Sequence, residues 1–413
     1  MPTVTRRYPS ATPNVKTDEQ LIDKFLTRGV EKIYPTPEEL KKKLKSGDRI
    51  RVYQGFDPTG PYLHVGHAMG IRALRILQQL GHEVIFLVGD FTSRVGDPDK
   101  NSARKMLTVE EIQANMNGWK EQASYLIEFE GENPVQFKQN FEWLSKLRFE
   151  DIIELMSHAT VQQMLEREMF QRRMKENDSI GLQEFIYPLM QGYDGVAMEV
   201  DMEIGGTDQT FNMLMGRQLS KAYLGKEKFV RTNELMDAPD QLTMSKTKGN
   251  GINLSDSSED MFGKAMSYPD HLITKGLRLL TDVATEDIWQ IEKQMEAGEN
   301  PMQYKKLMAF EIVKVIKGEN AAKQAQEHFE KTVQKGEVDM QNAIEVPVTV
   351  NETIFEIIKN ANIENVSGSE IRRVIEQAGV EINNQKVTDP NQKTQMKTGD
   401  IIKFGKRIFL RVK

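Results

Sequence analysis

Two of the six histidines in this 413-residue chain stand close together in a phrase rich in glycine and proline. Residues 55–67 read Gly-Phe-Asp-Pro-Thr-Gly-Pro-Tyr-Leu-His-Val-Gly-His, ending in His64 and His67. Imidazoles three positions apart at the start of a helix project from one side, where they can donate hydrogen bonds to phosphate oxygens that gain charge during a reaction. Gly66 leaves room for a flat base beside the backbone. A satisfied helix cap is the plainer interpretation, and the surrounding elements favour the chemical one.

The flanking sequence predicts a β-α-β unit with the histidines at the mouth of its helix. Apolar residues in 50–56 indicate a buried strand, and apolar residues then recur at helical spacing across 71–80 until Gly81 ends the helix. The apolar run 84–88 predicts the next strand. The first turn of such a helix carries unpaired N–H groups and the positive end of the helix dipole, so it attracts a triphosphate.

A polar stripe lies on a later predicted helix. Tyr187, Gln191 and Asp194 are four and three positions apart, so they share one helix face. Such a stripe is more often solvated surface. Here the intervening residues 188–190 and 192–193 indicate a helix that is buried on its other side. A buried polar stripe needs a hydrogen-bonding partner, and a ligand can provide it.

A second strand-to-helix junction lies at 200–212 and contains Gly205-Gly206-Thr207-Asp208-Gln209. Paired glycines allow a ligand to approach the backbone closely. The carboxylate of Asp208 can accept hydrogen bonds from both hydroxyls of a ribose. The junction therefore predicts another part of a nucleotide site.

The composition excludes several classes of protein. The chain has no cysteine, which excludes disulfides, thiol catalysis and cysteine-ligated zinc. It has no run of about 18 apolar residues, so we expect neither a membrane span nor a membrane partner. Residues 1–16 carry three basic residues and no apolar stretch. We expect a short N-terminal arm there rather than a transit peptide, in a cytoplasmic protein.

Charge is distributed unevenly along the chain. The net charge of −6 argues against a globally basic nucleic-acid coat. Residues 393–413 nevertheless hold seven basic residues against one acid, Asp400. A sheet edge protected by lysine and an RNA-binding surface both fit this tail. Its basic residues are Lys393, Lys397, Lys403, Lys406, Arg407, Arg411 and Lys413.

The alternation of strands and helices predicts an α/β fold, with a doubly wound parallel sheet that binds ligands at the carboxyl ends of its strands. A helical insertion interrupts the alternation, and its methionines are more typical of packing than of a cofactor site. Apolar faces of this insertion can also serve a dimer contact. The expected parts are an N-terminal arm (1–19), a Rossmann-like catalytic domain (20–241) with the insertion (about 106–190), an α-helical domain (242–333), a linker (334–345) and a small α+β domain (346–413).

These motifs, taken in order, resemble those of the class I aminoacyl-tRNA synthetases and, more narrowly, of the bacterial-type tyrosyl-tRNA synthetases. The resemblance runs from about residue 20 to the C-terminus. Its strongest element is 53–59, Tyr-Gln-Gly-Phe-Asp-Pro-Thr, followed by 64–67, His-Val-Gly-His, which is similar to that family's ATP-binding element. The phrase Val-Gly-Asp-Pro at 95–98, the polar helix and the 205–209 junction follow in the family's order. The last domain is similar to the small RNA-binding module that ends these enzymes.

The resemblance implies roles residue by residue. The positions matching the tyrosine site are Tyr53 and Asp194 at the phenol, Asp97, Tyr187 and Gln191 at the α-ammonium, and Gln209 beside the reacting carboxyl. His64 and His67 match the residues that stabilise the transition state of adenylate formation, and Lys246 matches a lysine that grips the triphosphate. The other positions matching the ATP site are Asp57, Pro58, Thr59, Gly66, Gly206, Asp208 and Thr247.

One motif departs from the family pattern. The family has a mobile loop with the pattern Lys-x-x-Lys-Ser or Thr, whereas 243–247 reads Thr-Met-Ser-Lys-Thr. Thr243 therefore replaces the first lysine, and Lys248 is a candidate to compensate for it. Three further bases lie near where the family binds pyrophosphate, and the sequence does not rank them: Lys100, Arg104 and Lys105.

The resemblance implies a ligase that activates L-tyrosine with ATP, accompanied by Mg²⁺, and passes it to tRNA(Tyr), with no protein-ligated metal. It also implies a homodimer. The expected RNA contacts are Arg372, Arg373, Lys403, Lys406, Arg407 and Arg411. A tryptophanyl enzyme shares the fold, but the Tyr53 and Asp194 pair and the C-terminal module disfavour it. An RNA-binding protein that has lost catalysis is the other alternative. Thr243 motivates that alternative, and both histidines and Asp208 oppose it.

Overall fold

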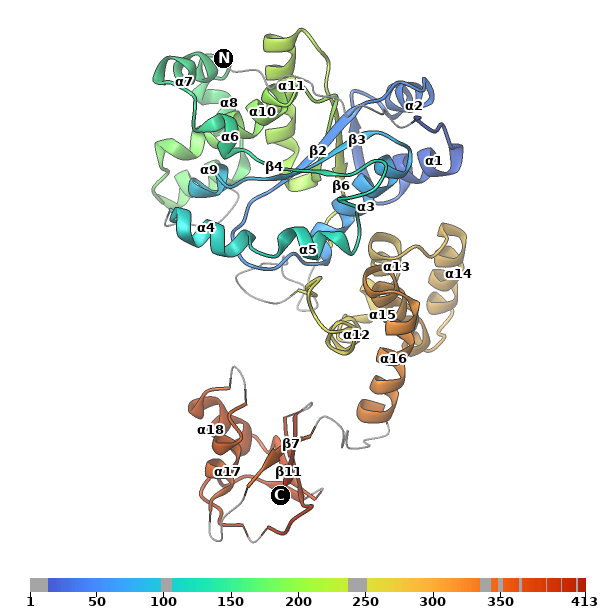
Figure 1. Ribbon diagram of the computed structural model, residues 1–413, viewed down its shortest axis with the longest axis vertical. Helices are drawn as coiled ribbons and strands as arrows, with labels where there is room; N and C mark the ends of the chain where they lie inside the picture. The colour runs from blue at the N-terminus through green and yellow to red at the C-terminus, as the bar shows by residue number, and fades with distance from the viewer. Residues whose placement is uncertain are drawn as a thin grey trace. The chain divides into compact units, whose positions relative to one another are not determined.

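The chain divides after Gln326 into two compact units, and each is described here by itself (Figure 1). Among the residues that the structure describes, no helix is both long and apolar enough to cross a membrane. The structure is a computed structural model that describes residues 14–97, 106–236, 251–334, 343–347, 352–363, 366–383, 385–394, 396–405 and 408–413.

A six-stranded sheet forms the centre of the first unit (Figure 1). Its strand order is β1-β6-β5-β2-β3-β4, with β1 antiparallel to β6 and every other pair parallel. The predicted Rossmann-like sheet is confirmed, and the antiparallel edge strand is an addition to it. The strands are β1 (Val30–Tyr34), β2 (Arg51–Phe56), β3 (Glu83–Val88), β4 (Gln136–Gln139), β5 (Met202–Gly206) and β6 (Phe229–Asn233).

The strand order reverses at the middle of this sheet. From β2 the chain continues to β3 and β4 on one side, and it then returns to β5 and β6 on the other side. In such a sheet the ligand crevice lies outside the carboxyl ends of the strands at the point of reversal. The ends of β2 and β5 carry the segments 53–59 and 205–209, in which the sequence placed two ligand-binding motifs.

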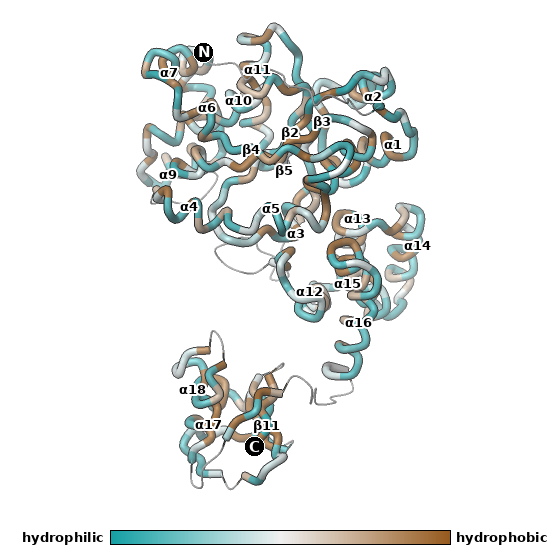
Figure 2. Tube along the Cα trace, viewed as in Figure 1, coloured by the Kyte–Doolittle hydropathy of each residue, from teal (hydrophilic) through white to brown (hydrophobic). Residues whose placement is uncertain are grey.

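Helices cover both faces of the sheet. The first, α3 (Val65–Gln79), packs on β2, β3 and β5, whereas α10 (Tyr187–Ala197) and α11 (Thr210–Leu224) share a core cluster with Tyr53. The neighbouring residue Gln54 packs against α3, since successive side chains of a strand point to opposite faces. Hydrophobic residues gather along the strands and on the inner sides of the helices (Figure 2).

The predicted end of α3 is confirmed. The helix begins after His64, whose backbone is extended, and its last turn is followed by Gly81. Gly81 has a φ of 87°, and a Cβ there would lie 2.7 Å from the carbonyl oxygen of Asn14. Only glycine fits this position without strain.

The predicted helical insertion also contributes a strand. Its third element, β4, pairs in parallel with β3 and forms one edge of the sheet. Four half-buried residues are too few to show a strand period in the sequence. The helices between β3 and α10 are η1 (Thr92–Arg94), α4 (Val109–Met116), α5 (Trp119–Ser124), α6 (Phe141–Leu144), α7 (Phe149–Met156), α8 (Val161–Leu165), α9 (Glu168–Glu176) and η2 (Leu182–Phe185).

Helices also begin and end the first unit. The helices α1 and α2 flank β1, and η3 links β5 to α11. After Gly251 a helical segment follows, in agreement with the sequence pattern. These elements are α1 (Glu19–Thr27), α2 (Pro37–Lys45), η3 (Thr207–Gln209), α12 (Ser258–Met266), η4 (Asp270–Leu272), α13 (Ile273–Leu280), α14 (Thr285–Glu296) and α15 (Pro301–Lys317). The helix α16 (Glu319–Phe329) contains the division after Gln326, and η5 (Glu330–Gln334) follows it.

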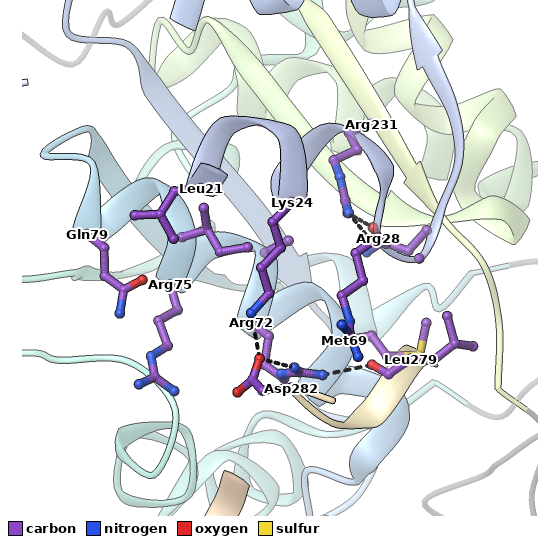
Figure 3. A pocket seen from close by; sticks show the side chains of 14 residues that line it. Leu21, Lys24, Arg28, Met69, Arg72, Arg75, Gln79, Arg231, Leu279 and Asp282 are labelled. Carbon is purple, nitrogen blue, oxygen red and sulfur yellow. Dashed lines mark hydrogen bonds and ion pairs between the residues drawn. The ribbon is translucent and has the colours of Figure 1, made fainter. Parts of the chain in front are cut away.

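Two arginines join the helical segment to the sheet layer by binding the last carbonyls of α13. Arg28, which follows α1, donates to the carbonyl oxygens of residues 277, 278, 281 and 283 at 2.6–3.0 Å. Arg72 of α3 donates to the carbonyl oxygen of Leu279 at 2.9 Å and to Asp282 at 2.8 Å (Figure 3). Unpaired carbonyls and the negative dipole end of a helix attract cations, so this contact stabilises the joint.

The second unit packs two helices on a five-stranded sheet of order β7-β11-β10-β8-β9. Its helices and strands agree with the small α+β domain that the sequence predicts, and two of its strands, β7 and β9, have only three residues each. β7 begins inside the stretch expected to be the linker, so the sheet starts earlier than 346. The elements are β7 (Ile344–Val346), α17 (Ile354–Asn360), α18 (Gly368–Glu376), β8 (Val380–Ile382), β9 (Gln385–Val387), β10 (Ile401–Phe404) and β11 (Ile408–Val412).

Candidate active site

A cavity of about 350 Å³ lies at the reversal point of the large sheet. It is lined by the ends of β2 and β5, the start of α3 and one face of α10. The predicted site residues that line it are Tyr53, Asp57, Thr59, His64, Gly66, His67, Asp97, Tyr187, Gln191, Asp194, Gly206, Asp208 and Gln209. The structure therefore brings segments that are far apart in sequence to one place.

A buried carboxylate occupies one end of the cavity. Asp194 is 3% exposed, and its two oxygens accept hydrogen bonds from Trp143 Nε1 at 2.7 Å and from Asn140 Nδ2 at 3.1 Å. Burial raises the pKa of Asp194 well above its usual range, while these two donors act in the opposite direction. Two N–H donors fix the carboxylate as an acceptor pointing to a set place.

Tyr53 lies beside this carboxylate and is also buried. Its hydroxyl donates to the backbone oxygen of Gln191 at 3.4 Å. Burial, and then the negative charges of Glu203 and Asp194, raise the pKa of Tyr53 well above its usual range. The phenol of Tyr53 is therefore neutral and keeps its proton.

A chain of hydrogen bonds connects this end to the nucleotide motif. The hydroxyl of Tyr187 donates to Asp57 Oδ2 at 2.8 Å, and Thr92 donates to Asp57 Oδ1 at 2.8 Å. The hydroxyl of Thr92 in turn accepts from Asn140 Nδ2 at 3.1 Å, and Asn140 also donates to Asp194. The positions predicted for tyrosine and for ATP therefore share one network.

A second group of polar residues lies at the carboxyl end of β5 and after β3. Asp97 accepts from Gln209 Nε2 at 2.6 Å and forms an ion pair with Arg167 at 3.4 Å. Gln209 Nε2 also approaches Asp208 Oδ2 at 3.2 Å. Arg167 is buried, and sequence reasoning did not select it. In the sequence Arg167 stands inside the predicted insertion and far from any motif, so no pattern marked it as a site residue.

A buried ion pair supports the face of α10. Glu203 Oε1 accepts from Gln191 Nε2 at 3.0 Å, and its other oxygen pairs with Lys228, whose side chain is fully buried. Neither charged residue was predicted. The lone acid in β5 and the lysine just before β6 gave no sign that they would meet, because their pairing arises from the sheet register.

The two histidines cap α3 with one nitrogen each. His64 Nδ1 accepts from the backbone N–H of Gly66 at 3.2 Å, and His67 Nδ1 accepts from the backbone N–H of His64 at 3.0 Å. Their ring centroids are 3.8 Å apart. A neutral imidazole that accepts at Nδ1 carries its proton at Nε2, and the hydrogen-bond network assigns that tautomer here. The helix-cap interpretation is therefore correct, and the rings also line the cavity.

The predicted lysine loop falls outside the described residues. It contains Thr243, Lys246, Thr247 and Lys248. The three pyrophosphate candidates, Lys100, Arg104 and Lys105, also lie outside the described residues. The chain before the loop lines the cavity, and the chain after the loop pairs beside His64. Leu235 and Met236 line the cavity, and 252–254 pairs with the backbone of 63–65 next to His64.

Pro58 is a predicted ATP position that does not line the cavity. It is buried, and its carbonyl oxygen accepts from Asn115 Nδ2 at 2.9 Å. Its place in the motif is to shape the turn between Asp57 and Thr59. Within the described ranges, no group of three or more His, Asp or Glu side chains is arranged to hold a metal ion.

In the second unit the predicted RNA contacts belong to two layers. Arg372 and Arg373 are exposed on α18, and Arg372 stacks on Phe355 of α17 with 4.6 Å to the ring centroid. Lys403 and Arg411 alternate with buried residues of β10 and β11, so they point away from the helices. The two arginines therefore lie in the helix layer, next to which Lys393 of the tail pairs with Thr353 at the start of α17, and their role in RNA binding stays a prediction. Lys406 and Arg407 lie outside the described part of the chain.

Known proteins agree with these observations. Residues 45–334 match a family described as tRNA synthetases class I (W and Y). The chain is 40% identical to a tyrosine–tRNA ligase of Thermotoga maritima, covering 94% of this chain and 96% of that protein. It is 41% identical to the ligase of Haemophilus ducreyi, with the same coverage of 94% and 96%.

Solved structures show the same fold at lower identity. A C-terminally truncated mitochondrial tyrosyl-tRNA synthetase of Aspergillus nidulans has a TM-score of 0.63 at 22% identity, covering 75% of this chain and 93% of that one. A tyrosyl-tRNA synthetase of Archaeoglobus fulgidus, complexed with L-tyrosine, has a TM-score of 0.57 at 21% identity, covering 74% and 99%. The chain belongs to the class I tRNA synthetases, in the family of the tryptophan and tyrosine enzymes.

Proposed function

We propose that this chain is a tyrosine–tRNA ligase, which activates L-tyrosine with ATP and transfers it to tRNA(Tyr). The observation that carries the proposal is the joining of two chemically different sites in one cavity. A buried hydroxyl and carboxylate lie at one end, and a helix N-terminus with two imidazoles lies at the other. Relatives at about 40% identity are tyrosine–tRNA ligases, which supports the same function.

The end with Tyr53 and Asp194 binds the phenol of the substrate. A phenolic O–H can donate to the Asp194 carboxylate, whose two N–H donors hold it in place. The substrate oxygen can accept from the hydroxyl of Tyr53. An amino acid without a hydroxyl leaves these buried groups unpaired, and this mismatch costs free energy.

The amino acid backbone of the substrate lies between the two ends. Asp97, Tyr187 and Gln191 hold its α-ammonium, and Gln209 lies beside the carboxylate that reacts. The contacts between Gln209 and Asp97 keep these groups together. Positioning two reactants in this way removes much of the entropic barrier to their reaction.

The ATP end begins at the N-terminus of α3. The Nε2–H groups of His64 and His67 donate to phosphate oxygens, and the helix dipole adds a positive field. Mg²⁺ accompanies ATP and is held mainly by its phosphates. The other residues assigned to ATP are Asp57, Pro58 through the turn that it shapes, Thr59, Gly66, Gly206, Asp208 for the ribose, and Lys246 and Thr247.

The chemistry needs no covalent nucleophile from the protein. The tyrosine carboxylate attacks the α-phosphorus of ATP, the bond to the β-phosphate breaks, and pyrophosphate leaves. A hydroxyl of the terminal adenosine of tRNA then attacks the mixed anhydride and releases AMP. Catalysis is positioning and stabilisation of charge.

We also propose a homodimer, formed through the insertion. Three apolar residues on one face of α7 are exposed: Phe149 at 77%, Ile153 at 55% and Met156 at 45%. An exposed apolar stripe of this kind is typical of an interface. Ile153→Glu should shift the mass measured by analytical ultracentrifugation towards the monomer. Met302→Glu, at an apolar residue of α15 that is 43% exposed, is the matched control. An unchanged mass of the Ile153 variant would exclude this face.

Amino-acid-dependent exchange of pyrophosphate into ATP tests the proposed reaction. The purified chain is incubated with each standard amino acid in turn. Exchange with tyrosine alone supports the proposal. Exchange with tryptophan would favour the other enzyme of the family, and tRNA binding without exchange would identify an RNA-binding protein that has lost catalysis. A cytoplasmic location, where the tRNA is charged, belongs to the same proposal.

A further inference from the structure

Asn212 stands between two glutamines of the proposed tyrosine site. Its amide nitrogen donates to Gln191 Oε1 at 3.0 Å and to Gln209 Oε1 at 3.0 Å. Asn212 lies in the first turn of α11 and is fully buried. One side chain therefore contacts two substrate-facing amides that come from different elements.

The outer ends of both glutamines are fixed by carboxylates. Gln191 Nε2 donates to Glu203 at 3.0 Å, and Gln209 Nε2 donates to Asp97 at 2.6 Å. A flipped glutamine would turn its oxygen towards a carboxylate oxygen, which is repulsive. The two glutamine oxygens must therefore point inward, and they meet where a group with two N–H donors is required. Asparagine supplies both donors from one atom.

The remaining atom of Asn212 argues against a purely structural role. Within the described chain, its Oδ1 is buried and has no hydrogen-bond partner. A buried unpaired acceptor destabilises the folded state, so an apolar residue would suit packing better. The two N–H donors are what the position uses.

We propose that Asn212 is a positioning residue for tyrosine, because it locks Gln191 and Gln209 into a single amide orientation. This inference rests on the proposed function. The Gln191 oxygen, which can accept two hydrogen bonds, is thereby held as an acceptor for the substrate's ammonium. Glu203 pairs with the buried Lys228 and fixes the nitrogen end of the Gln191 amide.

Pyrophosphate exchange by the full chain tests the proposal with two variants. Asn212→Asp keeps the shape but places a carboxylate against two amide oxygens, and Asn212→Ala removes the donors. Both should raise KM for tyrosine by roughly tenfold or more, since each leaves buried acceptors unpaired, with KM for ATP unchanged. The control is Ser220→Ala on the same helix. Ser220 is fully buried, and its hydroxyl has no partner in the described chain.

A double-mutant cycle separates positioning from general loss of structure. In the Gln209→Ala background, Asn212→Ala should cost less than it does alone, because one of its two targets is gone. Equal KM values for tyrosine in wild type and both Asn212 variants would overturn the inference while leaving the ligase intact. Parallel rises in KM for tyrosine and ATP, or additive effects in the cycle, would also overturn it. A wild-type chain without tyrosine-dependent exchange overturns the proposed function, and the inference with it.

Discussion

The indole N–H of Trp143 donates a 2.7 Å hydrogen bond to Oδ1 of Asp194, linking the insertion to the face of α10. The carboxylate that we assign to the phenol is thus oriented by a residue of a different element. Trp143 is 2% exposed, so this contact is made away from solvent, where a hydrogen bond is stronger than in water.

The first prediction concerns selection of tyrosine over phenylalanine. Tyr53→Phe removes a hydroxyl that we expect only tyrosine to use, so it should narrow the ratio of kcat/KM for the two substrates by roughly tenfold. Pyrophosphate exchange with each amino acid measures this ratio. Tyr193→Phe is a control. Tyr193 is a buried tyrosine of α10 that belongs to the same core cluster as Tyr53 but does not line the cavity. An unchanged ratio in Tyr53→Phe would remove Tyr53 from the phenol site.

The second prediction separates the two tasks of the histidines. Asparagine is a good N-cap residue but has no group at the place of Nε2. His64→Asn should therefore keep the thermal stability of the protein and still slow adenylate formation by about 10²- to 10³-fold. His64→Ala should lose both the rate and about 1 kcal/mol of stability. Tyrosine affinity should stay nearly constant in both variants, as measured by equilibrium binding. A fall in tyrosine affinity would mean that the imidazole is structural only.

The third prediction concerns the lysine loop. Lys246→Ala should cripple the ATP-dependent step, because the loop then loses the lysine that matches the family pattern. Thr243→Lys should restore the usual pair and change KM for ATP. Pre-steady-state adenylate formation measures both effects. A harmless Lys246→Ala together with a damaging Lys248→Ala would show that the motif was aligned in the wrong register.

The fourth prediction concerns the second unit. A chain that ends after Gln334 keeps the first unit, whose core is separate, and it should retain tyrosine-dependent exchange. Its tRNA charging should weaken sharply, with a shallower dependence on salt, because phosphate contacts release counterions. Ending the chain at Val346 would leave β7 without its sheet, so the earlier end is the better test.

Two pairs of substitutions then locate the RNA contact within that unit. One pair is Arg372→Ala with Arg373→Ala on α18, and the other is Lys403→Ala with Arg411→Ala on the sheet. Loss of tRNA affinity in one pair alone assigns the contact to that layer. If the truncated chain charges tRNA as well as the full chain, the basic tail is a sheet edge protected by lysine and not an RNA-binding surface.

The fifth prediction is a dependence of stability on pH. Burial, and then the charge of Arg49, lower the pKa of His82 to about 4. Its Nδ1 accepts from the backbone N–H of Ile50 at 3.4 Å. Between pH 6.5 and about 4 the unfolded chain binds a proton at this residue and the folded chain does not. The free energy of unfolding should therefore fall as the pH drops through this window, by about 3 kcal/mol at most.

Urea unfolding at pH 7.5 and pH 4.5 measures this loss against His82→Gln, which cannot titrate. The difference between the two proteins isolates His82 from the carboxylates that titrate in the same range. An equal loss in wild type and variant would show that His82 charges freely in the folded protein.

The sequence was most informative where function depends on local motifs. His64, His67 and Gly206 stand in phrases whose spacing already places them at strand-to-helix junctions. Trp143 and Asn140 were missed because they follow a four-residue strand inside an apparently helical insertion. They reach Asp194 only through tertiary contact, and no periodicity in the chain reports that contact.

Charged residues inside the fold were harder to predict for a related reason. Lys228 and Glu203 look like ordinary surface residues in the sequence, and their pairing depends on how β5 and β6 align. The layers of the second unit posed the same difficulty. Arg372 and Arg411 are both basic and exposed, but only the packing of α18 on the sheet shows that they face different ways.

The hydrogen bonds of Arg72 to residues at the end of α13 make α3 a rigid link between the helical segment and the cavity. α3 has fifteen residues, which makes a rod of about 22 Å, and a regular helix is stiff over that length. Its N-terminus carries the imidazoles at the cavity, while Arg72, along its length, is bonded to the helical segment. A displacement of α13 would therefore move α3, and with it the helix N-terminus that carries His64 and His67.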